Sequence, residues 1–347
     1  MEKQHKRRVR YSGTHPKSYK EKYKEHNPEK YADTIERVIR KGGTPAGMHI
    51  SICVNEILDF LKIKPGMIGL DATLGYGGHT KAMLQCLEGQ GHIYALDVDP
   101  IESAKTKERL EKQGFGDDVL TVRLQNFADI DLVTKETGKK FDFVLADLGV
   151  SSMQIDNPDR GFSYKVDGPL DLRMNPLKGT SAAERLKEIT QEELVGMLIE
   201  NADEPYAEEI AATVMKWFKK GKDIETTRQM KEVIEEALVY VPKADREEAV
   251  KKSCARTFQA LRIDVNSEFE VLYAFLEKLP EVLAPNGRVA ILTFHSGEDR
   301  LVKRSFKQLK DEGIYSDVCK DVIRPSAAEC VRNSRAKSTK MRWAIRS

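Results

Sequence analysis

The chain has 347 residues, 40% hydrophobic and 32% charged, which is the balance of a folded protein of about two domains. No run of about 18 apolar residues is present and the N-terminus lacks an apolar signal core, so neither a membrane span nor export is expected. Five scattered cysteines without a CxxC pair argue against disulfides and a zinc site, and they fit a reducing cytoplasm.

Basic residues are concentrated at both ends, although 57 basic and 55 acidic residues give a net charge of only +2. Residues 1–48 form a polar, basic leader with interleaved tyrosines, helical in texture only around Asp33–Arg40. Near the other end, the stretch from Arg324 to Arg346 carries basic residues against the single acid Glu329. Basic ends suit a polyanion such as nucleic acid, with solvated tails as the alternative.

From residue 49 onward, strand-like and helical segments alternate. The periodicity predicts helices over Ser51–Leu61, Thr80–Leu87 and Ile101–Gln113, and strands over Met67–Leu70, His92–Leu96, Val119–Leu124 and Phe141–Ala146. This alternation predicts a parallel, doubly wound α/β sheet whose ligand site lies at the carboxyl ends of the strands. Asp71, Asp97 and Asp147 follow three of these strands, so we expect them at that edge.

The alternation stops between residues 153 and 258, where no strand is expected. A loop rich in Gly, Pro and Asp comes first, and helices are predicted over Thr190–Glu200, Glu208–Lys219 and Thr227–Leu238. Strand texture returns at Arg288–Phe294. The sequence therefore predicts a helical insertion in an α/β domain, with segments 1–48 (leader), 49–152, 153–258 (insertion) and 259–347.

A glycine-rich loop follows the first strand and reads Asp71-Ala-Thr-Leu-Gly75-Tyr-Gly77-Gly78-His79. Glycines let the backbone approach a ligand, and the next helix offers free N–H groups. A dinucleotide fingerprint would need glycine where Thr80 stands, so a nucleoside without a pyrophosphate, such as S-adenosylmethionine, is favoured over a dinucleotide. A plain strand-to-helix turn is the other alternative. Asp97 stands where a carboxylate binds ribose hydroxyls.

The segment Asp147-Leu-Gly-Val-Ser151 fits methyl transfer to an exocyclic amine. Its carboxylate and hydroxyl can accept hydrogen bonds from the amine, which localises the nitrogen lone pair for in-line attack. A turn with a capping serine is the alternative. Phe127, after the third strand, either packs on an adenine or belongs to the core.

Two further segments carry candidate RNA contacts. Arg160-Gly-Phe162 and Arg173 interleave charge, glycine and an aromatic ring, which suits an unpaired base and phosphates, or an ordered loop with its own salt bridges. His295 follows the strand after the insertion, with Arg300 close behind, and no metal-ligand spacing or hydrolase triad surrounds it.

Together these segments resemble one family, the MraW (RsmH) methyltransferases, from about His49 to the C-terminus. The matching strings are Asp71-Ala-Thr-Leu-Gly-Tyr-Gly-Gly-His79, Asp147-Leu-Gly-Val-Ser-Ser-Met-Gln154, Arg160-Gly-Phe-Ser163, Gly168-Pro-Leu-Asp-Leu-Arg173, Phe258-Gln-Ala-Leu-Arg-Ile-Asp-Val-Asn266, Phe294-His-Ser296 and Asn333-Ser-Arg-Ala-Lys-Ser338. The resemblance implies a class I (Rossmann-like) S-adenosylmethionine-dependent methyltransferase fold with an inserted helical domain. It implies methylation of the N4 amine of a cytosine in 16S ribosomal RNA.

The resemblance also assigns roles to single residues. Cofactor contacts carry over to Gly77, Gly78, His79, Asp97, Phe127, Asp147 and Gln154. We expect Asp147 and Ser151 at the methyl-acceptor edge, and the RNA at Arg160, Phe162, Arg173, His295 and Arg300. No metal is expected.

The expected partner is 16S ribosomal RNA or the small ribosomal subunit in the cytoplasm, with a homodimer left open. The basic leader is absent from typical members of the family. The alternatives are a methyltransferase of the same fold acting on another RNA or DNA amino group, and a non-catalytic ribosome-binding protein. A DNA amino-methyltransferase would usually show a Pro-Pro-aromatic string where Leu148-Gly-Val150 stands, and retained cofactor positions argue against a non-catalytic protein.

Overall fold

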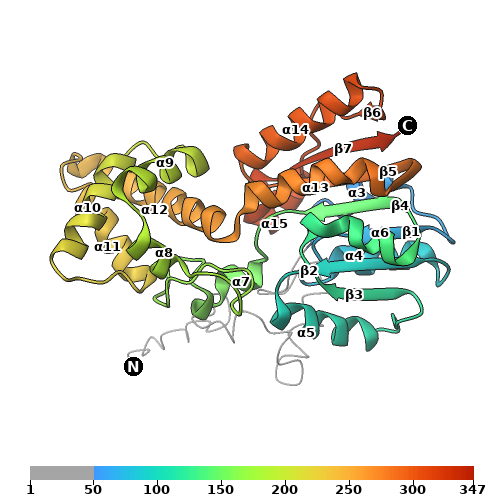
Figure 1. Cartoon of the computed structure of the whole chain (residues 1–347), viewed down its shortest axis with the longest axis horizontal. Coiled ribbons are helices and arrows are strands. Elements are labelled where there is room, and N and C mark those ends of the chain that lie inside the picture. Colours follow the sequence, from blue (N-terminus) through green and yellow to red (C-terminus); the bar gives the residue numbers. More distant parts are fainter. Residues whose placement is uncertain (1–50) are drawn as a thin grey trace, which may run out of the picture. The chain divides into compact units, whose positions relative to one another are not determined.

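A computed structural model describes residues 51–347, so the basic leader and its helical segment at Asp33–Arg40 lie outside the described residues. At its centre is one seven-stranded sheet with the order β3-β2-β1-β4-β5-β7-β6 (Figure 1). The strands are β1 (Ile68–Asp71), β2 (His92–Asp97), β3 (Leu120–Leu124), β4 (Phe141–Asp147), β5 (Leu283–Thr293), β6 (Tyr315–Val318) and β7 (Lys340–Arg346).

The first five strands pair in parallel, as predicted, and their order reverses between β1 and β4. Strand β7, which the sequence analysis did not predict, runs antiparallel to both β5 and β6, so the sheet is mixed and β6 again has the direction of β1 to β5. This strand order, with a single reversed strand between β5 and β6, is that of the Rossmann-like α/β fold of methyltransferases.

The C-terminal strand was not predicted because its charges resemble those of a basic tail. Lys340 and Arg342 alternate with apolar residues along β7, and both pair with Asp299. Arg346 donates hydrogen bonds to the carbonyls of Pro280 and Ile314. These basic residues therefore hold the fold together, and the alternative of a solvated C-terminal tail is wrong for β7.

Helices cover both faces of the sheet (Figure 1). One face packs against α6 (Ile130–Thr137), α13 (Glu268–Val282) and α14 (Ser296–Asp311), and the other against α3 (Val54–Leu61), α4 (Gly78–Leu87) and α5 (Pro100–Glu111). The central strands β1 and β4 are buried on both sides, which explains their continuous apolar runs.

Between β4 and β5 the chain leaves the sheet and builds a helical insertion with its own apolar core. Its helices are α7 (Ser152–Asp156), α8 (Ala182–Glu188), α9 (Gln191–Ala202), α10 (Ala207–Lys219), α11 (Thr227–Ala237) and α12 (Lys243–Asn266). The predicted capping box of α9 is present, since the Thr190 side chain accepts the Glu193 N–H. Helix α12 continues through residue 258, where the sequence analysis placed a segment boundary.

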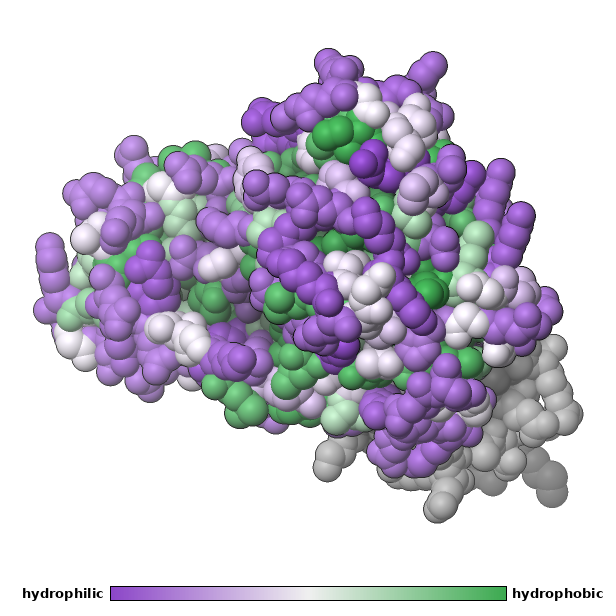
Figure 2. Space-filling model, turned by 45° about the vertical axis from the view of Figure 1, so that its right-hand side comes forward, coloured by the Kyte–Doolittle hydropathy of each residue, from purple (hydrophilic) through white to green (hydrophobic). Residues whose placement is uncertain are grey.

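No helix among residues 51–347 combines the length and apolar character needed to cross a bilayer. On the face shown in Figure 2, hydrophobic residues are scattered among hydrophilic ones. The segments that follow β1, β2 and β4 all start from one edge of the sheet, which is where the candidate site lies.

Candidate functional site

Three aspartates meet at the carboxyl edge of the sheet. Asp71, Asp97 and Asp147 are the last residues of β1, β2 and β4, which are adjacent and parallel. Asp71 is buried, and it accepts hydrogen bonds from the Thr80 hydroxyl at 2.6 Å and the Thr73 N–H at 3.0 Å. Asp71 thus fixes the glycine loop. Asp97 and Asp147, on the strands to either side, border the same loop.

The glycine loop is held from the side of α5. The Thr106 hydroxyl donates to the Gly75 carbonyl at 2.7 Å, and Arg109 donates to the Tyr76 carbonyl while lying over the Tyr76 ring. Gly77 has φ of 79°, and a Cβ there would lie 2.7 Å from Thr106. A side chain at Gly77 would therefore displace the loop from α5.

Asp97 accepts only backbone hydrogen bonds. Its two carboxylate oxygens take the N–H of Gly75 and the N–H of Asp99, each at 2.8 Å. Burial raises its pKa to about 6, and these bonds offset only part of that shift. Asp97 is thus a desolvated carboxylate that no cation among residues 51–347 neutralises directly.

Asp147 is the least satisfied carboxylate of the three. Its Oδ1 is buried without a hydrogen-bond partner in the described part of the chain, and its Oδ2 lies 3.5 Å from His79 Nδ1. Burial raises its pKa to about 6, although His79 opposes the rise. The His79 ring is held at the other nitrogen, 2.9 Å from the Ile52 carbonyl. An unpaired buried acceptor beside a fixed imidazole is suited to a ligand that donates hydrogen bonds.

Phe127 lies beyond β3 at the same edge, in a short 3-10 turn capped by Asn126. It is half-buried, and its ring packs edge-on against Phe275 with centroids 5.2 Å apart. The structure thus gives Phe127 a contact with the core and leaves part of the residue exposed, so the two predicted roles are compatible.

The segment after β4 is tied to the segment after β2. Ser151 caps α7, and its hydroxyl accepts the Gln154 N–H at 3.2 Å. The Gln154 side chain accepts the Ser151 N–H and donates to Asp99 at 2.8 Å. Both polar ends of Gln154 are therefore engaged, and a ligand would meet the side of this amide.

Arg160 lies inside the protein and does not present its guanidinium to solvent. It pairs with the fully buried Asp99 at 2.6 Å and donates to the carbonyls of Arg173 and Met174. Direct contact between Arg160 and RNA, expected from the sequence, is at odds with this burial. The geometry makes Arg160 a link between the cofactor edge and the insertion.

The neighbouring candidates are also engaged internally. Phe162 is buried in the core of the insertion, and Arg173 pairs with Asp171 through two hydrogen bonds of 2.8 and 2.7 Å. Of the five predicted RNA contacts, Arg300 is the exposed one, with its closest acid, Asp203, 4.0 Å away.

His295 begins α14, at the end of the strand beside β4. Its Nε2 lies 3.2 Å from the buried Glu298, which also accepts the Phe294 N–H. Glu268 lies close enough to share a cation with these two residues. However, Glu268 already accepts two hydrogen bonds from Arg262. The Arg262 guanidinium thus supplies the positive charge that a metal ion would bring.

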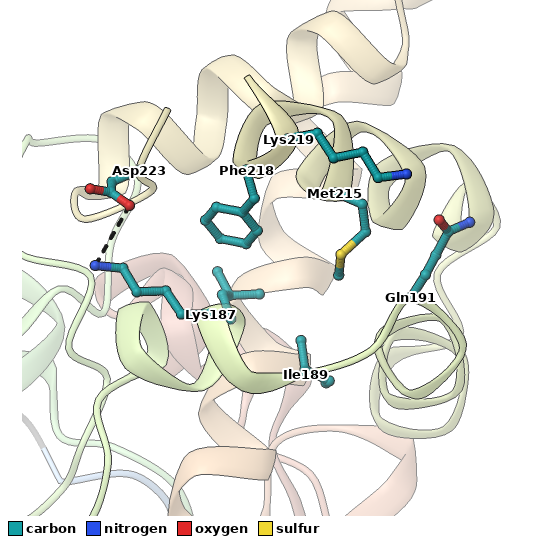
Figure 3. A pocket seen from close by; sticks show the side chains of 8 residues that line it. Lys187, Ile189, Gln191, Met215, Phe218, Lys219 and Asp223 are labelled. Carbon is teal, nitrogen blue, oxygen red and sulfur yellow. Dashed lines mark ion pairs between the residues drawn. The ribbon is translucent and has the colours of Figure 1, made fainter. Parts of the chain in front are cut away.

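A pocket of about 540 Å³ lies within the insertion (Figure 3). Apolar side chains including Met215 and Phe218 line it, and Lys187 at its edge pairs with Asp223 at 3.7 Å. None of the predicted site residues lines this pocket, so it is separate from the aspartate edge.

The wider role of Asp99 was not predicted from the sequence. Asp99 does cap α5, accepting the N–H groups of Ile101 and Glu102. It also binds Arg160 and Gln154, which are far away along the chain. No local pattern encodes such a pair. The only signal available in the sequence was that Arg160 and Gln154 both lie in strings that match the MraW family.

The buried Arg160–Asp99 pair makes a strong prediction for stability. Arg160→Gln leaves Asp99 buried without its cation, and should lower the free energy of unfolding by about 3–5 kcal/mol. The matched control is Arg185→Gln, which breaks a partly exposed pair with Asp264 and should cost at most about 1 kcal/mol. Urea titrations of the two variants measure the two free energies of unfolding. Equal losses of stability would contradict the view that Arg160 neutralises a buried charge.

Asp147 should oppose folding at neutral pH. Because its folded pKa is about 6, above the ordinary value of 3.8, the ionised form is less favourable in the folded protein than in the unfolded chain. Asp147→Asn should therefore raise the free energy of unfolding at pH 7.5 by roughly 1–3 kcal/mol, with a smaller gain at pH 4.5. The control is Asp131→Asn, which should destabilise, because Lys135 and Lys278 lower the pKa of Asp131 to about 2. A loss of stability in Asp147→Asn would refute the raised pKa of Asp147.

Comparison with known proteins identifies the family. The model of the MraW methylase family matches residues 46–347, so residues 1–45 of the leader precede the matched region. Two relatives named ribosomal RNA small subunit methyltransferase H 1 align over nearly the whole chain. The one from Lachnoclostridium phytofermentans is 70% identical over 99% of this chain and 93% of its own length. The one from Agathobacter rectalis is 67% identical over 100% of this chain and 99% of its own length.

A more distant relative, ribosomal RNA small subunit methyltransferase H of Thioalkalivibrio sulfidiphilus, is 38% identical over 88% of this chain and 99% of its own length. The match thus extends through the sheet, the aspartate edge and the helical insertion. This chain belongs to the MraW methylase family.

Proposed function

We propose that this chain transfers a methyl group from S-adenosylmethionine to the N4 amine of a cytosine in 16S ribosomal RNA. The observation that carries the proposal is the family match over residues 46–347, with relatives named as small-subunit ribosomal RNA methyltransferases. The aspartate edge supports it independently, because unneutralised carboxylates there suit a ligand rich in hydrogen-bond donors.

The residues present fit the cofactor. Gly77 and Gly78 lie where a side chain would meet Thr106 or Ser51, so glycine there keeps the loop in the position in which Gly75 bonds Asp97 and His79 lies beside Asp147. In the proposal, the Asp97 carboxylate takes the ribose hydroxyls, Phe127 contacts the adenine, and Gly77, Gly78, His79 and Gln154 line the remainder. S-adenosylmethionine, when bound, supplies an electrophilic methyl group on a sulfonium.

Asp147 and Ser151 are our candidates at the methyl-acceptor edge. The unpartnered Oδ1 of Asp147 can accept a hydrogen bond from the N4 amine, which localises a lone pair otherwise delocalised into the ring. The backbone of Asp147 is fixed because its N–H donates to the Thr73 hydroxyl at 2.7 Å. Holding the nitrogen within about 3–3.5 Å of the methyl carbon lowers the barrier. The amine proton leaves after transfer, so no separate base is required before it.

Arg160 and Phe162 act in the proposal by positioning the insertion, since both are buried. His295 and Arg300, at the start of α14, remain our candidates for contact with the RNA. The same residues would fit another amino group in RNA. An amino group in DNA is the other candidate substrate.

We place this activity in the cytoplasm. All five cysteines lie among the described residues and are free, which fits a reducing compartment. We propose the same domain division as above, into residues 1–48, 49–152, 153–258 and 259–347. A homodimer remains a prediction from the sequence.

The first test is nucleoside mass spectrometry of 16S ribosomal RNA from cells with and without this gene. N4-methylcytidine should disappear on deletion and return with the wild-type gene. Asp97→Ala should fail to restore it, because the ribose loses its acceptor, whereas Asp117→Ala, which changes an exposed loop carboxylate, should restore it. An unchanged level of N4-methylcytidine after deletion would refute the proposed substrate.

The pH dependence of cofactor binding should report on Asp97. Its pKa of about 6 means that this carboxylate is mostly protonated at pH 5, whereas an ordinary aspartate is still ionised there. The affinity for S-adenosylmethionine should be constant between pH 7 and 8 and fall below pH 6, towards tenfold per pH unit. Calorimetry across this range measures it. A flat profile down to pH 5 would show that the Asp97 charge is not used.

A further inference from the structure

Helix α14 presents a row of cations to solvent. Arg300, Lys303, Arg304 and Lys307 are exposed, whereas Val302 and Phe306 are buried against the sheet. At about 100° per residue, the four cations occupy roughly a quarter to a third of the helix circumference, opposite the buried side. We call these four residues the α14 stripe.

The two acids in the first turn of the same helix face inward, whereas Asp311 in its last turn is exposed. Glu298 is buried beside His295, and Asp299 is buried between Lys340 and Arg342 of β7, at 2.8 and 2.7 Å. The two acids in the first turn are therefore unavailable to the stripe. Over its first three turns, helix α14 thus has its negative charges inside and the cations of the stripe outside.

The stripe cations also lack partners elsewhere. Within residues 51–347, Lys303, Arg304 and Lys307 make no ion pair or side-chain hydrogen bond, and Arg300 has only Asp203 at 4.0 Å. Helix α5 shows the usual alternative. Its Lys105, Lys107 and Lys112 each pair with an acid of the same helix, at 2.9, 3.5 and 2.6 Å. Helix α5 thus compensates its exposed lysines locally, whereas α14 does not.

The stripe begins next to the aspartate edge. Helix α14 is capped by His295, two residues after β5 ends, and Leu292 of β5 pairs with Asp147 of β4. From Arg300 to Lys307 the helix rises by about 10 Å. The stripe is thus a line of positive charge leading away from the methyl-acceptor edge along one helix.

We propose that the α14 stripe binds the phosphate backbone of the RNA strand that carries the target base. This inference rests on the proposed function, which supplies the polyanion, and adds the surface that holds it. A membrane surface fits less well, because the apolar residues Val302 and Phe306 are turned into the core and cannot insert into lipid. An acidic protein partner is the competing occupant, and the test separates it from RNA.

The test compares two triple variants of the full chain with equal loss of charge. The first replaces Lys303, Arg304 and Lys307 with alanine, and the control replaces Lys105, Lys107 and Lys112 of α5. Each is assayed for methylation of small ribosomal subunits purified from cells lacking this gene, over a series of salt concentrations. Cofactor affinity is measured by calorimetry in parallel.

For the stripe variant we expect the KM for subunits to rise tenfold or more at 0.15 M salt, with kcat and cofactor affinity unchanged. Losing three phosphate contacts should make the plot of log(kcat/KM) against log salt concentration shallower by about 2. The α5 variant should match the wild type.

Two outcomes overturn the inference. Equal effects of both triple variants would show only a general dependence on net charge. An unchanged KM and salt slope in the stripe variant would place the RNA elsewhere and leave the stripe to another partner. Failure of the wild-type chain to methylate subunits would instead refute the proposed function, so the two failures are distinguishable.

Discussion

The buried ion pair between Arg160 and Asp99 determines how the two halves of this protein meet. Asp99 donates its N–H to Asp97 and takes the Arg160 guanidinium on its carboxylate. Arg160 in turn binds the Arg173 and Met174 carbonyls, and the Met174 N–H donates to Asn266 at the end of α12. One chain of hydrogen bonds therefore connects the proposed ribose carboxylate to the longest helix of the insertion. A buried pair of this kind adds little net stability over an apolar pair, so its value is geometric.

At the aspartate edge, buried charge reduces stability and is kept for a ligand. Asp97 and Asp147 both have pKa values raised by burial, and no arginine or lysine in the described part of the chain pairs with either. Folding would be more favourable with neutral side chains there. The nearby Arg160 could have compensated a carboxylate of the edge, but Asp99 and two carbonyls occupy it. The charge is thus kept available for a ligand, which is the pattern expected of a functional site.

Local sequence patterns were enough to predict the parallel strands β1 to β5, the glycine loop and the helical insertion. Each of these depends on periodicity, turn residues and caps that lie close together in the chain, such as Thr190 and Glu193 of α9. The features that were missed depend on long-range pairs. Arg160 meets Asp99 across 61 positions, and Arg342 meets Asp299 across 43. A charged residue that finds such a partner becomes internal, and nothing next to it in the sequence indicates this.

That limitation also explains why charge counting alone drew attention to the basic residues near the C-terminus. The basic residues near the C-terminus looked free, yet Lys340, Arg342 and Arg335 pair with acids of the fold. Helix α14 looked balanced, because Glu298 and Asp299 precede its cations in the sequence. Burial of those two acids reverses the reading, since it removes them from the surface and leaves the cations of the α14 stripe uncompensated. A surface able to bind a polyanion can therefore arise where the sequence is locally neutral, provided that the fold turns one sign of charge inward.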